Sequence, residues 1–441
     1  MRPAELILAA VLAASTATGA AAQDTPVIDT AATPRVTLAE AIRLAEQVQP
    51  RVIQAAAAVE NAAARERTAK AAYLPSLNLN SSTNRSFSGV PSRVDPNTGL
   101  SVGSSSGSLS MSLSSSVDLF TGFRRGADTR AARATGDAAE ASLVDARFQQ
   151  ALTTTNQFFD ALAARQLLAV RGASVRRAEE QLKVSINKLA AGSATRSDSL
   201  RSRVTLGNAQ LQLIQAQSAL ATAEANLARL TGQGGRVAAA DDSSFYVLPA
   251  MLDSAALRAE AQARSPQLQA ALASAEAANA SYSASRSAYW PTLSLSGNIG
   301  MSGSSSRDYD LYNNRSVSLG LSWPLFNRFQ REQNIEVQRN ALDVAEAQAA
   351  ETARVISADL TSQLAALEAG RARVAITQVS VVAAQEDLRV QQERYRLGAS
   401  TIVDVLTSQE ALDQAEVDAV NARFDYLRAR AQIEALLGRS L

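Results

Sequence analysis

Two aspartates, Asp198 and Asp404, have the spacing of residues that cap helices. Each lies three residues after a threonine, Thr195 or Thr401, and the S/T-x-x-D/E pattern is typical of a helix start. In such a capping box the side chain and the backbone N–H of the two residues bond reciprocally. A carboxylate in the first turn also interacts favourably with the helix dipole, by about 0.3–1 kcal/mol. We therefore expect each aspartate to begin a helix.

Most catalytic and metal-binding chemistry is missing from the sequence. The 441 residues include no Cys and no His, which excludes a thiolate nucleophile, a disulfide, a Cys/His zinc site and a histidine base. The run Gly103–Gly107 matches G-x-S-x-G, but that nucleophile motif needs a strand–turn–helix setting and a His partner. We therefore predict that the protein is not an enzyme and uses no cofactor or metal. The 43 basic and 42 acidic residues give a net charge of +1, which argues against nucleic acid as a partner.

The N-terminal residues predict an export signal. Residues 1–22 combine Arg2, an apolar run and an Ala-rich cleavage site, as a secretory signal peptide does. Residues 23–35 are expected to form a flexible lead. The apolar run is too short to span a bilayer, and no later stretch reaches about 18 uninterrupted apolar residues. No transmembrane helix is therefore predicted.

The rest of the sequence consists of two copies of one unit. Ala-Tyr-Leu-Pro at 72–75 recurs as Ala-Tyr-Trp-Pro at 288–291, and Gly192 and Asp198 recur as Gly398 and Asp404. Two copies are too few for a solenoid array, so an internal duplication fits better. Each repeat is expected to contain a helix, a β-hairpin, a long helix and a further helix. The predicted domains are repeat 1 over 36–232, an inter-repeat equatorial segment over 233–252, and repeat 2 over 253–441.

Proline-free tracts predict unusually long helices. Proline breaks helix interiors, and none occurs between Pro96 and Pro249 or after Pro324. A helix of about 68 residues would be ~100 Å long. The expected helices run over 37–72, 124–191, 197–231, 254–288, 328–397 and 402–437.

Each long helix is expected to pair with the helix that follows it. Apolar residues recur every seven positions from Leu360 to Tyr395 and, in repeat 1, from Leu168 to Leu189. That spacing indicates a coiled-coil-like seam, although an ordinary buried helix stripe has a similar pattern. Glycine after each long helix allows a left-handed residue, and the threonine cap follows at once. The sequence therefore predicts two helical hairpins with tight tips.

Four segments, 77–80, 109–114, 293–296 and 317–323, alternate large apolar with small polar residues. This alternation is typical of transmembrane β-strands, although any one run also fits a half-exposed strand of a soluble sheet. Tyr73, Trp290 and Trp323 near the strand ends suit an aromatic girdle at a membrane interface.

Four strands are too few for a membrane barrel, which needs about eight. An open edge in lipid would leave backbone groups unpaired, at several kcal/mol each. We therefore expect the barrel to be shared between chains, with eight strands in a dimer or twelve in a trimer.

The run Tyr395–Leu406 (YRLGASTIVDVL) gives the most specific likeness to a known family. With the two Tyr/Pro turns and the duplication, it resembles the TolC-type outer-membrane efflux proteins over residues 36–440. The resemblance implies an α+β membrane protein of long coiled-coil hairpins and four transmembrane strands per chain. It further implies a homotrimer with a 12-stranded β-barrel in the outer membrane and an α-helical barrel in the periplasm.

The resemblance also implies a function and partners. The function is export of small molecules or polypeptides through a tripartite efflux or type I secretion system. The partners are a periplasmic adaptor (membrane fusion) protein, an inner-membrane pump of the RND or ABC class, and outer-membrane lipid. The alternative is a structural coiled-coil surface protein or adhesin, which would explain the helices but not four amphipathic strands.

Site residues follow from the same resemblance. Tyr395 and Asp404 fall on the family's aperture positions, and Asp198 is the acidic counterpart in repeat 1. Ser400 stands where the family often has a latch arginine and Thr407 where it has a second acidic ring, so a different set of bonds is expected to hold the gate. Asp404 is either a helix cap only or a cap that also joins a pore ring. The adaptor is expected to dock over the hairpin tips: Ala191, Gly192, Ser193, Ala194, Leu397, Gly398, Ala399 and Ser400.

Overall fold

The computed structural model describes residues 33–87, 93–94, 96–97, 101–102, 106–246, 253–304 and 311–439. The chain divides into two units, Met1–Pro34 and Arg35–Leu441, and only Thr33 and Pro34 of the first are described. The predicted signal peptide and most of the predicted lead lie outside the described residues. So do Gly103 to Ser105 of the G-x-S-x-G match and the end of the equatorial segment.

Helices make up most of the described chain, and they occur in the same order in its two halves. The first half has α1 (Leu38–Val48), α2 (Pro50–Ala71), α3 (Arg124–Ala190) and α4 (Arg196–Thr231); the second has α5 (Ser254–Arg264), α6 (Pro266–Ser285), α7 (Gln330–Arg396) and α8 (Ile402–Leu437). Both α3 and α7 contain 67 residues, so each is ~100 Å long. The prediction of two very long helices, each followed by one of about 35 residues, is confirmed.

The predicted helices over 37–72 and 254–288 are each broken in two, which corrects the sequence reading. The breaks fall at Gln49 and Ser265, immediately before Pro50 and Pro266, the first residues of α2 and α6. A proline disfavours helical geometry in the residue before it, and Gln49 is accordingly extended (φ −77°, ψ 128°). Short 3₁₀ turns at Ser243–Tyr246 and Arg286–Tyr289 complete the helical elements.

Four long strands form one antiparallel sheet in the order β2-β5-β7-β8, which confirms the predicted number of strands. Their bounds are Ser76–Ser86, Ser106–Phe120, Thr292–Ser304 and Tyr312–Ser322. Among the described residues, β2 and β8 pair on one side only, so the sheet has two free edges. Two minor sheets join β1 (Arg35–Val36) to β6 (Ala238–Ala239) and β3 (Arg93–Val94) to β4 (Ser101–Val102).

The register gathers the large apolar residues on one face of the four-stranded sheet, and the row through Ile299 ends at Arg315 in β8. Residues directly opposite in an antiparallel pair share a face, and the row Leu79–Leu113–Ile299 runs across three strands. The neighbouring row on the other face is polar. On that face the hydroxyls of Ser82 and Ser110 form a hydrogen bond of 2.7 Å. The apolar face is exposed in the single chain, with Val317 at 81% and Leu321 at 71%.

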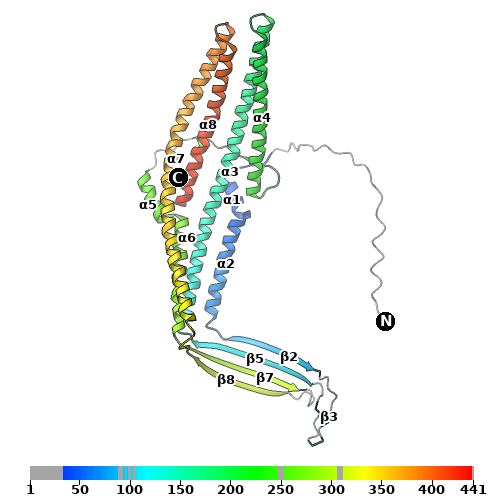
Figure 1. Cartoon of the computed structure of the whole chain (residues 1–441), viewed down its shortest axis with the longest axis vertical. Helices are drawn as coiled ribbons and strands as arrows, with labels where there is room; N and C mark the ends of the chain where they lie inside the picture. The colour runs from blue at the N-terminus through cyan, green and yellow to red at the C-terminus, as the bar shows by residue number, and fades with distance from the viewer. Residues whose placement is uncertain are drawn as a thin grey trace, which may run out of the picture. The chain divides into compact units, whose positions relative to one another are not determined.

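Figure 1 shows the four strands together at one end of the helices and the tips of the α3–α4 and α7–α8 hairpins at the other. Midway along the helices lies the main core, which includes Phe158, Leu227, Phe424 and Ile433. The seven-residue stripe of repeat 2 is buried at five of its six positions, Leu360, Leu367, Val374, Leu388 and Tyr395. In repeat 1 only Val175 of the stripe is buried, and small or polar residues such as Ala178 and Ser185 fill the seam instead.

The passage from strand to long helix uses left-handed residues in both halves. Phe123 (φ 68°) precedes α3 and Phe329 (φ 61°) precedes α7, and such a conformation is uncommon for a bulky side chain. Gly122 also has a positive φ, and a Cβ there would lie 2.4 Å from the Cβ of Trp290. This close approach fixes how β5 enters α3.

Two arginines stabilise the junctions between the strands and the long helices. The Arg125 guanidinium lies 4.6 Å from the ring centroid of Tyr73 and donates to the Leu119 carbonyl. Arg331 lies 4.1 Å from the ring centroid of Tyr289 and donates to the Pro324 carbonyl. Cation–π contacts and hydrogen bonds to backbone carbonyls thus hold each strand–helix junction at corresponding points.

Candidate functional site: the hairpin tips

The tip of each helical hairpin is built from a glycine reversal. After α3 the chain turns at Gly192 (φ 72°), and the Ser193 N–H donates to the Lys188 carbonyl over 2.9 Å. After α7 it turns at Gly398 (φ 81°), and the Ala399 N–H donates to the Arg394 carbonyl over 2.8 Å. These bonds are those of a Schellman motif, in which glycine supplies the left-handed residue.

Both predicted capping boxes are present. The Thr195 N–H donates to the Asp198 carboxylate over 2.9 Å, and the Asp198 N–H donates to the Thr195 hydroxyl over 3.3 Å. Thr401 and Asp404 form the same pair with the same two distances. The two aspartates therefore begin α4 and α8, within a few residues of the reversals.

Asp404 has more donors than Asp198. One of its oxygens also accepts bonds from the Thr401 hydroxyl (2.8 Å) and the Ser400 hydroxyl (2.9 Å). The Thr401 N–H and these two hydroxyls lower the pKa of Asp404 from its ordinary value of 3.8, because each bond favours the charged carboxylate. Asp404 is exposed and carries its charge at neutral pH. The serine in place of a latch arginine is thus bound to this carboxylate.

Tyr395 lies inside the second hairpin rather than at its surface. Its side chain is 5% exposed and packs with Leu388, Ile402 and Val405. Among the described residues its hydroxyl has no hydrogen-bond partner. In this arrangement the ring, and not a hydroxyl bond, holds Tyr395 in place.

Lys188, in the last turn of α3, reaches from the first hairpin to the second. Its ammonium lies 4.3 Å from the Tyr395 ring centroid and donates a hydrogen bond to the Tyr395 carbonyl. The sequence analysis did not single out Lys188. The available signal was its rarity, since the chain has only three lysines, Lys70, Lys183 and Lys188.

The eight expected docking residues lie at the two reversals, and six of them are exposed. Leu397 is the largest apolar group among them and is 77% exposed. Of the remaining seven, Ser400 and Ala194 are partly buried. A large apolar side chain at the outermost turn is therefore available to a partner.

An ion-pair cluster joins α3 to α8 below the tips. Arg177 bonds to Asp413 over 2.5 Å and to Glu416 over 2.7 Å, and Ser174 donates to the second oxygen of Asp413 over 2.5 Å. The three charged side chains are 16–21% exposed. Sequence reasoning missed these residues because their partners are more than 230 positions apart.

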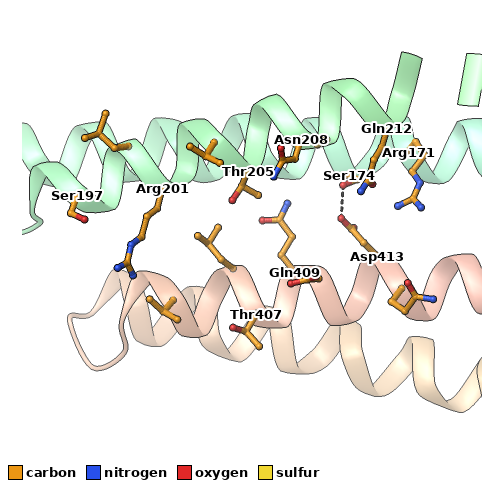
Figure 2. Close-up of a pocket in the computed structure, with 17 residues that line it drawn as sticks. Arg171, Ser174, Ser197, Arg201, Thr205, Asn208, Gln212, Thr407, Gln409 and Asp413 are labelled. Carbon is orange, nitrogen blue, oxygen red and sulfur yellow. Dashed lines mark hydrogen bonds between the residues drawn. The ribbon is translucent and has the colours of Figure 1, made fainter. Parts of the chain in front are cut away.

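Between this cluster and the tips lies a polar cavity of about 620 Å³ (Figure 2). Asn208 and Gln212 approach it from α4, and Gln409 and Asp413 from α8. Gln409 is 3% exposed, and its amide nitrogen has no partner among the described residues. The cavity lies between the first turns of α4 and α8, which belong to different hairpins, while Lys188 and Tyr395 make a separate contact between α3 and α7.

The described residues do not form a metal-binding cluster or a membrane-spanning helix. No group of three or more acidic side chains there is arranged to hold a metal ion. None of the helices in the described ranges combines the length and the apolar character needed to cross a membrane.

Comparison with known proteins covers most of the chain. Residues 41–233 and 257–439 match the family model described as "Outer membrane efflux protein". The pyoverdine export outer membrane protein OpmQ of Pseudomonas aeruginosa is 28% identical to this chain. The matched region covers 64% of this chain and 60% of that relative. The outer membrane protein TolC of Vibrio cholerae is 24% identical over 91% of this chain and 90% of its own length.

A solved structure has the same fold. The outer membrane protein VceC of Vibrio cholerae superposes with a TM-score of 0.74 at 21% identity, over 91% of this chain and 96% of that one. The order of helices and strands is therefore one that outer-membrane proteins adopt.

Proposed function

The chain belongs to the outer membrane efflux protein family, and from this membership we propose that it is the duct of a tripartite efflux or type I secretion system. The protein lies in the outer membrane, and its helical part extends into the periplasm. The proposal is that three copies share one 12-stranded barrel and one helical tunnel, through which small molecules or polypeptides leave the cell.

The observation that supports a barrel shared between chains is the four-stranded sheet with its two free edges. Among the described residues, strands β2 and β8 each lack a partner on one side, and one face of the sheet carries large apolar residues from all four strands. In lipid an unpaired edge costs several kcal/mol per backbone group, so strands of neighbouring copies cover both edges. Twelve strands leave room for a channel, whereas eight give a bore filled by side chains.

The division of the chain follows from this proposal. Residues 1–22 direct export, and residues 23–35 are a lead. Repeats 36–232 and 253–441 each supply one hairpin of the tunnel and two strands of the barrel, joined by the equatorial segment 233–252.

The gate of the proposed tunnel is at the hairpin tips. Asp404 and Asp198 are exposed or partly exposed beside the reversals, and three-fold symmetry would place three copies of each around one axis. Tyr395 sets the position of the α7 end from inside the hairpin. The adaptor docks over Leu397 and its neighbours and over the reversal at Gly192, and an RND or ABC pump supplies the substrate.

The alternative function, a structural coiled-coil surface protein or adhesin, needs no conducting path. It accounts for the long helices but gives no role to the apolar sheet face. Membership of an efflux family favours the duct.

Native mass and planar-bilayer conductance of the purified chain test the proposal together. The expected result is a mass of three chains that conducts ions. A stable monomer, or a trimer that never conducts, would contradict it. Leu397→Glu should abolish efflux in cells while leaving the trimer intact, because a charge replaces the exposed apolar group. Ser380→Glu, an exposed position of α7 about 17 residues from the tip, is the matched control and should leave efflux unchanged.

A further inference from the structure

A small cavity lies where the sheet meets the helices, at the start of α3 and the end of α6. Its volume is about 360 Å³, and its walls include Phe123, Tyr289, Trp290, Arg130 and Arg286. Aromatic rings thus meet two arginines at the passage from strands to helices. None of these five side chains belongs to the hairpin tips.

The aromatic wall continues the apolar face of the sheet. Phe120 pairs with Leu293 in the sheet register, so the two share the apolar face. The Phe120 ring contacts the Phe123 ring edge-on at 5.4 Å, and Phe123 contacts Trp290 at 5.7 Å. Phe123 is 68% exposed and Trp290 is 53% exposed. Aromatic side chains with one apolar and one polar surrounding are typical of the membrane–water interface.

The two arginines of the cavity have no charged partner in the described structure. Arg130 and Arg286 are exposed, and neither guanidinium makes an ion pair or hydrogen bond with a described residue. The cavity walls contain no Asp or Glu. The neighbouring arginines differ, since Arg124 pairs with Asp128 and Arg125 stacks on Tyr73. Two free guanidinium groups beside an apolar surface are complementary to a phosphate that carries acyl chains.

We infer that this cavity binds the headgroup of an anionic phospholipid in the periplasmic leaflet of the outer membrane. Arg130 and Arg286 bind the phosphate, and the acyl chains lie along Phe123, Trp290 and the apolar face of the sheet. The inference rests on the proposed function, because it requires the sheet to stand in the membrane with the helices on the periplasmic side. Basic groups at a membrane surface favour anionic lipid by about fivefold each.

Tryptophan fluorescence gives a direct test, because Trp290 and Trp323 are the only tryptophans of the chain. In a Trp323→Phe background, Trp290 reports alone from the cavity wall. The protein is reconstituted into phosphatidylethanolamine vesicles that contain a minor fraction of brominated phosphatidylglycerol or, separately, brominated phosphatidylethanolamine. The bromine atoms stand near the headgroup end of the acyl chains and quench a nearby indole.

The expected result is several-fold stronger quenching by the brominated phosphatidylglycerol. Arg130→Gln with Arg286→Gln should remove this preference. Arg203→Gln with Arg373→Gln should keep it, because this control deletes the same charge at exposed helical positions. Only variants whose native mass is that of an intact trimer are compared. Because the substituted side chains are exposed, we expect all variants to fold.

Equal quenching by the two lipids would overturn the headgroup inference and leave the shared barrel standing. Quenching by neither lipid would overturn both, since Trp290 would then lie away from the bilayer. A preference that survives the double substitution, or that millimolar inorganic phosphate abolishes, would also overturn the inference. The latter result would show a site for a soluble anion instead of a lipid.

Discussion

Lys188 covers the ring of Tyr395, with its ammonium 4.3 Å from the ring centroid and a hydrogen bond to the tyrosine carbonyl. This contact joins the end of α3 to the end of α7, so it connects the two hairpins close to their tips. The two ends are thus in contact although Ser400 stands where the family often has a latch arginine. The contact uses the ring and the backbone carbonyl of Tyr395, and the tyrosine hydroxyl has no partner among the described residues.

Lys188→Met should loosen the proposed gate. The substitution keeps the length of the side chain but removes the cation and its hydrogen bond, so the two hairpins lose a charged contact worth about 1–2 kcal/mol. We expect a higher basal conductance of the reconstituted channel in planar bilayers. Tyr395→Phe should leave conductance close to wild type, because the hydroxyl that it removes has no partner.

The matched control is Lys183→Met, an exposed lysine of the same helix. It should conduct as wild type does. A rise with Tyr395→Phe but none with Lys188→Met would show that the hydroxyl, and not the lysine, holds the gate.

Asp404→Asn and Thr401→Ala separate a pore charge from a helix cap. Both disturb the capping box, but only the first removes the charge, whereas Thr401→Ala keeps it and removes a cap worth about 1 kcal/mol. If Asp404 lines the aperture, Asp404→Asn alone should lower cation selectivity, measured as the reversal potential in a salt gradient. Equal selectivity in the two variants would assign Asp404 to capping only. Asp198→Asn provides the comparison in repeat 1.

The contribution of Asp404 to stability should depend on pH. Its folded-state pKa is below the ordinary value of 3.8, so the charged carboxylate stabilises the fold above pH 3.8. That stabilisation is lost as the pH falls through the lower, folded-state pKa. The difference in thermal midpoint between wild type and Asp404→Asn should therefore be largest at neutral pH and shrink below pH 3.8. A difference that stays constant down to pH 2 would contradict the role of these hydrogen bonds.

Arg177→Ala should destabilise the contact between the two hairpins. It leaves the largely buried Asp413 and Glu416 without their cation, and removing one partner of a buried pair costs about 3 kcal/mol. The thermal midpoint should fall by several degrees. Arg354→Ala breaks the exposed Arg354–Glu351 pair and should change stability by less than about 0.5 kcal/mol. Equal effects of the two substitutions would mean that the cluster contributes no more than a surface pair.

The sequence predicted the parts of this fold that follow from local patterns. Proline placement and spacing located the long helices, alternation located the four strands, and T-x-x-D located both caps. The breaks before Pro50 and Pro266 could also have been predicted, because a proline disfavours helical geometry in the residue before it. The contacts of Arg177 and Lys188 were not, because they join residues more than 200 positions apart.

The seam of repeat 1 shows a further limit of pattern reading. Leu168, Leu182 and Leu189 have the expected spacing, yet they are only partly buried. Small residues such as Ala178 let the helices approach closely and take the buried positions instead. Tyr395 likewise matches an aperture position in sequence, whereas its burial depends on side chains from α8 and α3.

Cross-linking between the free edges of the sheet tests whether three copies share one barrel. The chain has no cysteine, so Asn80→Cys in β2 and Ser318→Cys in β8 would be its only thiols. Two other strands lie between β2 and β8 in the sheet, a separation of about 14 Å, so a cross-linker of about 8 Å joins different chains only. On intact outer membranes we predict a denaturing-gel ladder that ends at three chains. A ladder that stops at two, or a chain that stays single, would contradict a barrel shared by three copies.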